Sequence, residues 1–320
     1  MIVSKVIFIF IFIKLIEKLE KKSLSAIILQ SILDYRKYKL SKKVDPYKGK
    51  ETFLSRKYKY LMDNPEKTIS YPVKEKFYDD MQVYTINDNG DKNQKVLIYF
   101  YGSAYYRQIT SLHLKNLKRI IDKTNVKIIL PNYHKAYDHT FKQVYDKVHK
   151  MYEDVIKDNS ISNIYMAGDS SGGGLALGFA KYLRDIRVEL PQEIFLFSPW
   201  LDVSFKNEQY KKYEKYEAYL DVKRLRDIGE CWAGGKEYVT SAYASPIYGD
   251  LRNLPPLHIF TGTNEIFYPD VRKLHKELKK VNIKHYYSAK KNMIHAYNVF
   301  PIREAKSVIN YVAKKIKDIK

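Results

Sequence analysis

The stretch Met166-Ala167-Gly168-Asp169-Ser170-Ser171-Gly172-Gly173-Gly174 decides the fold prediction for this chain. It follows the short apolar run 163–165 and precedes a helix-like run at 175–183. A strand, a Gly-x-Ser-x-Gly turn and a helix form the context that exposes a serine hydroxyl on a strained turn. Only Ser170 has glycine two residues away on both sides. A phosphate-binding turn is the alternative, but no Walker lysine follows and GxGxxG is not matched.

The composition indicates one large α/β domain or two small ones. The chain has 320 residues, of which 45% are hydrophobic and 14% aromatic. Its single cysteine, Cys231, excludes a disulfide framework. The formal charge of +21 comes mostly from scattered lysines, without a zinc-finger spacing or an RNA-binding aromatic signature. We therefore expect no specific nucleic-acid partner, and the diffuse positive charge favours an anionic membrane surface or acidic solutes.

The N-terminus carries a short apolar segment whose unbroken core is Val6–Ile13. It is too short to span a bilayer, which takes about 20 apolar residues. A charged run at 17–22 stands where a signal peptide would have small residues for cleavage. A membrane-lying or lid helix is the favoured reading, with a cleaved signal, a short anchor and a buried segment as alternatives. The expected location is cytoplasmic, or peripheral to a membrane through this segment.

The chain changes character after its first quarter. Residues 1 to about 80 are highly charged and indicate helices, whereas short apolar runs alternate with amphipathic runs from about residue 95 onward. The predicted strands are 95–100, 126–130, 164–167, 194–197, 257–261 and 284–288, and the predicted helices are 112–123, 141–157, 175–183, 271–280 and 301–319. This alternation predicts an α/β fold with a mostly parallel sheet covered on both faces.

The predicted domains are a helical N-terminal cap segment, 1–85, and a catalytic domain, 86–320. The interval between Pro199 and Pro255 contains no clear strand. We expect an insertion at about 203–250 that acts as a substrate cap, because long insertions between sheet strands often do.

A serine nucleophile needs a histidine base and a carboxylate that orients it. In an α/β-hydrolase the chain order is serine, acid, histidine. His295 lies between the last predicted strand and the final helix, from where a base can reach the turn. Glu265 follows the strand 257–261 and is the predicted acid. Asp270 is its rival, although an acid at the start of a helix also simply favours the helix dipole.

The predicted oxyanion hole consists of backbone N–H groups. One comes from Ser171, directly after the nucleophile, and the others come from Gly102 and Ser103 in the loop after the strand 95–100. An ordinary turn of small residues is the alternative reading of that loop.

These segments together resemble the hormone-sensitive-lipase-like bacterial esterases, whose elbow reads GDSAG. The resemblance rests on GDSSGGG at 168–174, SPWLD at 198–202, SPIY at 245–248 with LPP at 254–256, a weakened YRLAPEHPF at 133–141, and HAY at 295–297. It covers about 90 to 315. It implies the α/β-hydrolase fold, a cap built from the N-terminal helices and the 200–250 insertion, and the triad roles given above.

The main departure from that family is the loop Tyr101-Gly102-Ser103-Ala104, which stands where the family has HGGG. Tyrosine replaces the bracing histidine, and serine and alanine replace two glycines. A lost glycine that needs a positive φ would cost about 1–2 kcal/mol of strain.

The expected function is a serine carboxylic-ester hydrolase that acts on short- to medium-chain acyl esters of small molecules or lipids. We expect no metal and no organic cofactor. A deacetylase or amidase on the same fold is the alternative enzyme, and a non-hydrolytic small-molecule-binding protein is the alternative outside enzymes. The sequence leaves the oligomeric state open.

Overall fold

The protein is built around one eight-stranded sheet in the computed structural model, which describes residues 2–41 and 62–318. The strands are β1 (Val73–Tyr78), β2 (Met81–Ile86), β3 (Val96–Phe100), β4 (Lys127–Pro131), β5 (Ile164–Asp169), β6 (Glu193–Phe197), β7 (Leu257–Gly262) and β8 (His285–Lys290). Their order in the sheet is β1-β2-β4-β3-β5-β6-β7-β8. Neighbours from β4 to β8 run parallel, and β2 pairs antiparallel with both β1 and β4.

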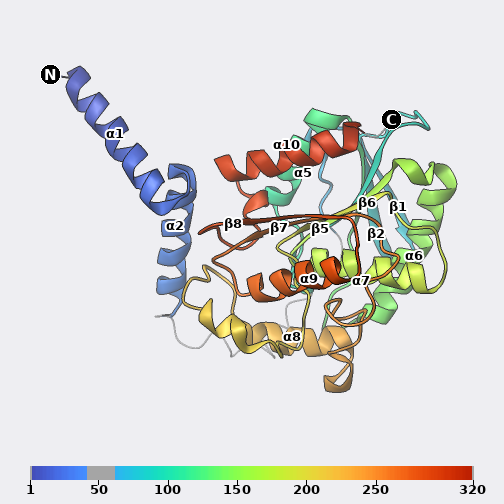
Figure 1. Ribbon diagram of the computed structural model, residues 1–320. Coiled ribbons are helices and arrows are strands. Elements are labelled where there is room, and N and C mark those ends of the chain that lie inside the picture. The colour runs from blue at the N-terminus through green and yellow to red at the C-terminus, as the bar shows by residue number, and fades with distance from the viewer. Residues whose placement is uncertain (1, 42–61, 319–320) are drawn as a thin grey trace.

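Helices cover both faces of this sheet (Figure 1). They are α5 (Ser111–Thr124), α6 (Phe141–Asp158), α7 (Ser171–Asp185), α9 (Tyr268–Lys280) and α10 (Arg303–Asp318). The helices α5 and α10 pack together on one face, and α6, α7 and α9 lie on the other. Strands β3, β5, β6 and β7 are therefore buried along their whole length, as central parallel strands are. The predicted fold class is confirmed.

One stretch differs from the sequence-based expectation. Residues 73–86 form the strands β1 and β2, whereas a helical N-terminal region was predicted up to about residue 80. β1 is an edge strand whose four central residues are exposed, so its charged side chains gave no apolar pattern to detect. The boundary at 85 remains a prediction, and residues 42–61 of that segment lie outside the described residues.

The N-terminal part forms two long helices, α1 (Ile2–Glu20) and α2 (Leu24–Ser41), followed by the short α4 (Glu66–Ile69). In Figure 1, α1 projects away from the body of the molecule. Within the described residues, no helix is both long enough and apolar enough to cross a membrane. The predicted insertion contains the amphipathic helix α8 (Val222–Ala233), whose apolar face is buried.

Candidate active site

Ser170 sits on the strained turn that the sequence predicts, between the end of β5 and the start of α7. Its backbone has φ 54° and ψ −124°, a conformation that non-glycine residues rarely adopt. The flanking glycines are required by close approach. A Cβ at Gly168 would lie 2.2 Å from the carbonyl oxygen of Gly172, and one at Gly172 would lie 1.9 Å from that of Phe100. The turn therefore needs glycine at both positions.

Hydrogen bonds hold this turn in place against the next strand. The Ser170 N–H donates to the carbonyl of Phe197 at 2.9 Å, and the Trp200 N–H donates to the carbonyl of Ser170 at 2.8 Å. The strain at the turn is thus offset by bonds to β6 and to the segment after it.

His295 and Glu265 meet at the carboxyl end of the sheet. Nδ1 of His295 lies 2.5 Å from Oε2 of Glu265, and both side chains are buried. The other carboxylate oxygen of Glu265 accepts bonds from the Gly262 N–H, at 3.0 Å, and from the Thr261 hydroxyl. The acid is thereby fixed, and it fixes the imidazole in turn.

The surroundings of His295 favour its charged form. Burial lowers the pKa of His295, but its hydrogen bond to Glu265 and the negative charges of Glu265, Glu217 and Asp169 outweigh burial, so the net shift is upward. An imidazole that gains a proton easily, and is held by a carboxylate, has the properties of a general base.

Asp270, the rival acid, has a different environment. It lies in the first turn of α9, and its Oδ1 accepts a hydrogen bond from Asn207 at 2.7 Å. Burial raises the pKa of Asp270 to about 7, with the negative charge of Asp202 acting in the same direction. Of the two candidates, Glu265 is the one that contacts His295.

Ser170 and His295 both line one pocket of about 510 Å³. The loop after β3, α2 and the segment 218–225 complete its wall, which also includes Gly102 and Ser103. Of the N-terminal helices, α2 lines this pocket together with the insertion. That these two segments form a substrate cap remains a prediction. The volume lies within the range of small-molecule sites.

Two of the three predicted oxyanion donors already have hydrogen-bond acceptors within the protein. The Gly102 N–H donates to Oδ1 of Asp169 at 2.9 Å, and the Ser103 N–H donates to Oγ of Ser171 at 2.9 Å. The Ser171 N–H, at the start of α7, has no acceptor among the described residues. One of the three predicted donors is therefore available without rearrangement.

Ala104 carries the backbone strain that is expected where a family glycine has been replaced. It has φ 48°, in the left-handed region that favours glycine, whereas Ser103 is not among the residues with positive φ. Of the two residues that replace family glycines, only Ala104 therefore has a strained backbone conformation.

Asp169 holds in place the loop 101–104, the predicted oxyanion loop, a role that the sequence analysis missed. Its buried carboxylate accepts bonds from the Tyr99 hydroxyl at 2.7 Å and from the Gly102 N–H, and it lies 3.3 Å from Nε2 of His113. His113 also completes the N-terminal cap of α5 with Thr110. The Thr-x-x-His spacing before an apolar helix was the available signal, although a capping box usually has Glu or Gln there.

Tyr101 braces the same loop where the family has histidine. Its hydroxyl donates to Asn132 at 2.7 Å and accepts a bond from the buried ammonium of Lys135 at 2.8 Å. Burial lowers the pKa of Lys135 well below its usual value. The bracing function is thus retained by a different set of side chains.

The insertion is tied directly to the loops of Glu265 and His295 by two residues that the sequence analysis also missed. The hydroxyl of Tyr219 donates to the carbonyl of His295 at 2.8 Å. The buried carboxylate of Glu217 accepts the N–H of Ile266 at 3.2 Å, next to Glu265. Burial raises the pKa of Glu217; the positive charge of His295 opposes this shift and the negative charge of Glu265 adds to it. Nothing in the local sequence distinguishes these residues from the many other charged and tyrosine residues of the insertion.

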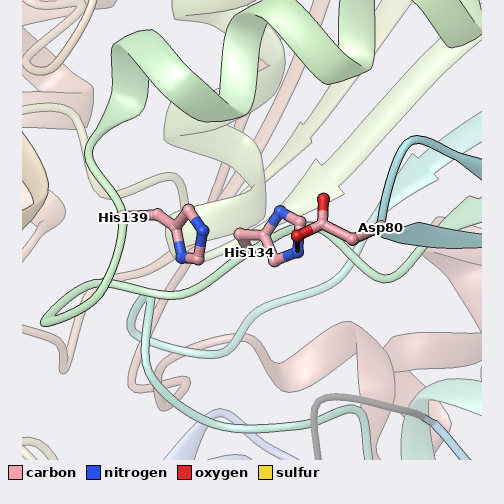
Figure 2. A group of neighbouring side chains, drawn as sticks. All are labelled: Asp80, His134 and His139. Atoms are coloured by element: carbon pink, nitrogen blue, oxygen red, sulfur yellow. Dashed lines mark ion pairs between the residues drawn. The ribbon is translucent and has the colours of Figure 1, made fainter.

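A separate cluster of ligand-type side chains consists of Asp80, His134 and His139 (Figure 2). Their potential ligand atoms lie within 4.8 Å of one another. However, the ammonium of Lys147 donates to Asp80 and, at 3.1 Å, to Nδ1 of His134. Burial, aided by the charge of Lys147, lowers the pKa of His134 to about 4. The cluster is an ion-pair network that already contains a cation, and we assign no metal to it.

A buried His–Glu pair and a strained serine turn at the carboxyl end of a mostly parallel sheet define an α/β-hydrolase. Residues 97–299 match the family Abhydrolase_3, of the alpha/beta hydrolase fold, and the chain belongs to that family. The match confirms the resemblance to the hormone-sensitive-lipase-like group and the prediction of an esterase- or lipase-like hydrolase.

Relatives and solved structures agree with this assignment. The chain is 23% identical over 229 residues to an esterase of Acinetobacter venetianus, covering 69% of this chain and 74% of the relative. It is 27% identical over 187 residues to an acetyl-hydrolase of Streptomyces hygroscopicus, covering 58% of this chain and 62% of the relative. The crystal structure of a candidate esterase from Staphylococcus aureus superposes with a TM-score of 0.75 at 26% identity, covering 80% of this chain and 88% of that one. The crystal structure of EstE5 shows the same fold, with a TM-score of 0.78 at 22% identity over 92% of this chain and 98% of its own.

Proposed function

We propose that this protein is a serine carboxylesterase with Ser170 as nucleophile, His295 as general base and Glu265 as the acid that orients it. The observation that carries the proposal is the buried 2.5 Å contact between His295 and Glu265 in a pocket that Ser170 also lines. A purely ligand-binding protein has no need of a strained serine, a buried imidazole and a carboxylate in one place.

In the proposed reaction His295 removes the hydroxyl proton of Ser170, and the oxygen attacks the ester carbonyl. The resulting oxyanion accepts the N–H of Ser171, and those of Gly102 and Ser103 once they leave their present acceptors. His295 then gives the proton to the departing alcohol. A water molecule, deprotonated by the same histidine, hydrolyses the acyl-serine and releases the acid.

The pocket favours short- to medium-chain acyl groups. Its volume of about 510 Å³ is modest, and Leu33, Leu112, Leu225, Val299 and Phe300 give it apolar wall. The names of the relatives, which include an esterase, an acetyl-hydrolase and a triacylglycerol lipase of Mycobacterium tuberculosis, support ester hydrolysis.

A fluorophosphonate probe and a substrate panel test this proposal. We expect the probe to label the wild type and not Ser170→Ala. Among p-nitrophenyl acetate, butyrate, octanoate and palmitate, we expect the shorter esters to be hydrolysed fastest. Absence of labelling in the wild type would favour the non-hydrolytic binding protein. Labelling together with faster cleavage of acetylated sugars or amides would favour the deacetylase or amidase.

We also propose that the N-terminal helices rest on an anionic membrane surface. Large apolar side chains are exposed at regular spacing on both helices: Ile11, Phe12, Leu15 and Leu19 on α1, and Ile28, Ile32 and Tyr35 on α2. The exposed lysines at 14, 18 and 21 and the net charge of +21 complement anionic headgroups.

Vesicle sedimentation tests this contact. We expect the full chain to sediment with vesicles of phosphatidylcholine and phosphatidylglycerol more than with phosphatidylcholine alone. The double variant Leu15→Glu/Leu19→Glu should lose most of this binding, because it places charge on the exposed apolar stripe. Equal sedimentation of wild type and variant would contradict the proposal.

A further inference from the structure

The pocket that contains Ser170 and His295 is bordered by an unusual number of cations. Four positively charged side chains from three separate segments line it: Arg36 and Lys37 of α2, Arg107 of the loop after β3, and Arg224 of α8. Gathering like charges around one cavity is unfavourable unless something compensates them.

The carboxylates of the pocket wall do not compensate all of them. Asp169 is buried and already bonded to Tyr99 and to the Gly102 N–H. Asp221 accepts the backbone N–H of Arg224 as the N-terminal cap of α8. Among the described residues, neither Arg36 nor Arg107 takes part in an ion pair. Two exposed guanidinium groups therefore face this pocket without a carboxylate partner.

Contacts with neighbouring groups hold three of these four cations in place. The guanidinium carbons of Arg107 and Arg224 lie 5.0 and 4.9 Å from the centre of the Tyr106 ring. Tyr106 is buried and gives both groups a common flat support. The ammonium of Lys37 donates to the carbonyl of Glu217 at 2.6 Å, which ties α2 to the cap.

We infer that this pocket is specific for esters that also carry an anionic group, a carboxylate or a phosphate, bound by Arg36 and Arg107. Guanidinium groups match both kinds of anion in charge and in fork geometry. The inference rests on the proposed esterase function and names its substrate class. A carboxylate would enter on the acyl side of the ester, whereas a phosphate would enter on the alcohol side as in a phosphoglycerol ester.

Two pairs of substrates distinguish a carboxylate on the acyl side from a phosphate on the alcohol side. The first pair is the mono-p-nitrophenyl ester of glutaric acid and p-nitrophenyl pentanoate, which differ in a terminal carboxylate. The second is butyrylglycerol phosphate and butyrylglycerol. We expect kcat/KM to be about tenfold higher for the anionic member of at least one pair at low salt, and the preference to shrink as salt rises.

Arginine-to-glutamine variants locate the effect. In Arg36→Gln and Arg107→Gln, the ratio of anionic to neutral kcat/KM should fall by about threefold or more. Arg187→Gln is the matched control, because Arg187 is an exposed arginine just beyond the end of α7 that is remote from Ser170. It removes the same charge and should leave the ratio unchanged.

Three results would overturn the inference: a preference for the neutral ester in both pairs, no preference in either, or a ratio that the two pocket variants do not change. If no ester is hydrolysed and Ser170 is not labelled, the proposed function fails separately. The anionic subsite is then decided by calorimetric titration of butyrylglycerol phosphate, whose binding must be weaker in Arg107→Gln than in Arg187→Gln.

Discussion

The Nδ1 atom of His295 lies 2.5 Å from a carboxylate oxygen of Glu265, and neither side chain is more than 2% exposed. In the chain these residues belong to two different loops, one after β7 and one after β8. The parallel pairing of these strands brings both loops to the same edge of the sheet. A carboxylate held in this way sets the orientation of the imidazole and its affinity for a proton.

Glu265→Gln should therefore reduce activity and change its pH dependence. We expect kcat to fall by about 10³–10⁴, because the amide cannot stabilise the charged imidazole. His295 must be neutral to act as a base, so activity falls as pH drops through its pKa, which is raised in the wild type. Without Glu265 burial dominates, so the acidic limb of the kcat/KM profile should move to lower pH. An unchanged limb in Glu265→Gln would contradict the assignment.

Asp270→Asn tests the rival acid through protein stability. Burial raises the folded-state pKa of Asp270 to about 7 from an ordinary value near 3.8. The folded state thus holds a proton that the unfolded state releases, and the stability contributed below pH 3.8 is lost as pH rises toward 7. The full effect is at most about 4 kcal/mol.

In Asp270→Asn this loss should disappear, so the variant gains free energy of unfolding over the wild type as pH rises from mild acid to neutral. Urea unfolding at several pH values measures the difference, and Asp158→Asn, at an exposed helical position, is the control. Hydrolysis should persist in Asp270→Asn with its acidic limb in place. A collapse of kcat like that of Glu265→Gln would show that Asp270 is the acid.

Ser171→Ala tests whether the Ser171 hydroxyl competes with the oxyanion for the Ser103 N–H. The Ser171 hydroxyl accepts the Ser103 N–H at 2.9 Å and competes with a developing oxyanion for that donor. A net hydrogen bond contributes about 0.5–1.5 kcal/mol. Removing the competitor should raise kcat by roughly threefold to tenfold.

The control for this change is Ser245→Ala, another buried serine whose hydroxyl bonds to backbone groups at Val203 and Val239. It should not raise kcat. A fall of about 10² in Ser171→Ala would mean that the hydroxyl itself supports the reaction, and the competition argument would be wrong.

The sequence predicted the parts of this molecule that local chemistry defines. The Gly-x-Ser-x-Gly turn is specified by close backbone approach at Gly168 and Gly172, so the pattern carries the geometry with it. Glu265 and His295 could be placed because parallel strands bring successive loops to one edge. The strand β1 could not, since an exposed edge strand has no apolar face to give it a pattern.

Contacts between distant segments account for the rest. Asp169 and His113 are 56 residues apart, and Tyr219 and His295 are 76 apart, so no local pattern links them. The bond between the Ser103 N–H and the Ser171 hydroxyl likewise arises only when β3 and β5 lie side by side. Sequence patterns therefore predicted the three proposed triad residues. The groups that hold the predicted oxyanion loop and the insertion could be identified only from the folded structure.

Ala104→Gly should stabilise the protein, because Ala104 occupies a left-handed backbone conformation with φ 48°. That conformation costs a non-glycine residue about 1–2 kcal/mol. Glycine relieves the strain but adds about 0.5–1 kcal/mol of chain entropy to the unfolded state. We therefore expect a net gain of roughly 0.5–1 kcal/mol in the free energy of unfolding, measured by urea denaturation. Ala176→Gly, inside helix α7, should instead lose about 1 kcal/mol or more. Destabilisation in Ala104→Gly would mean that alanine makes contacts in this loop that outweigh its backbone strain.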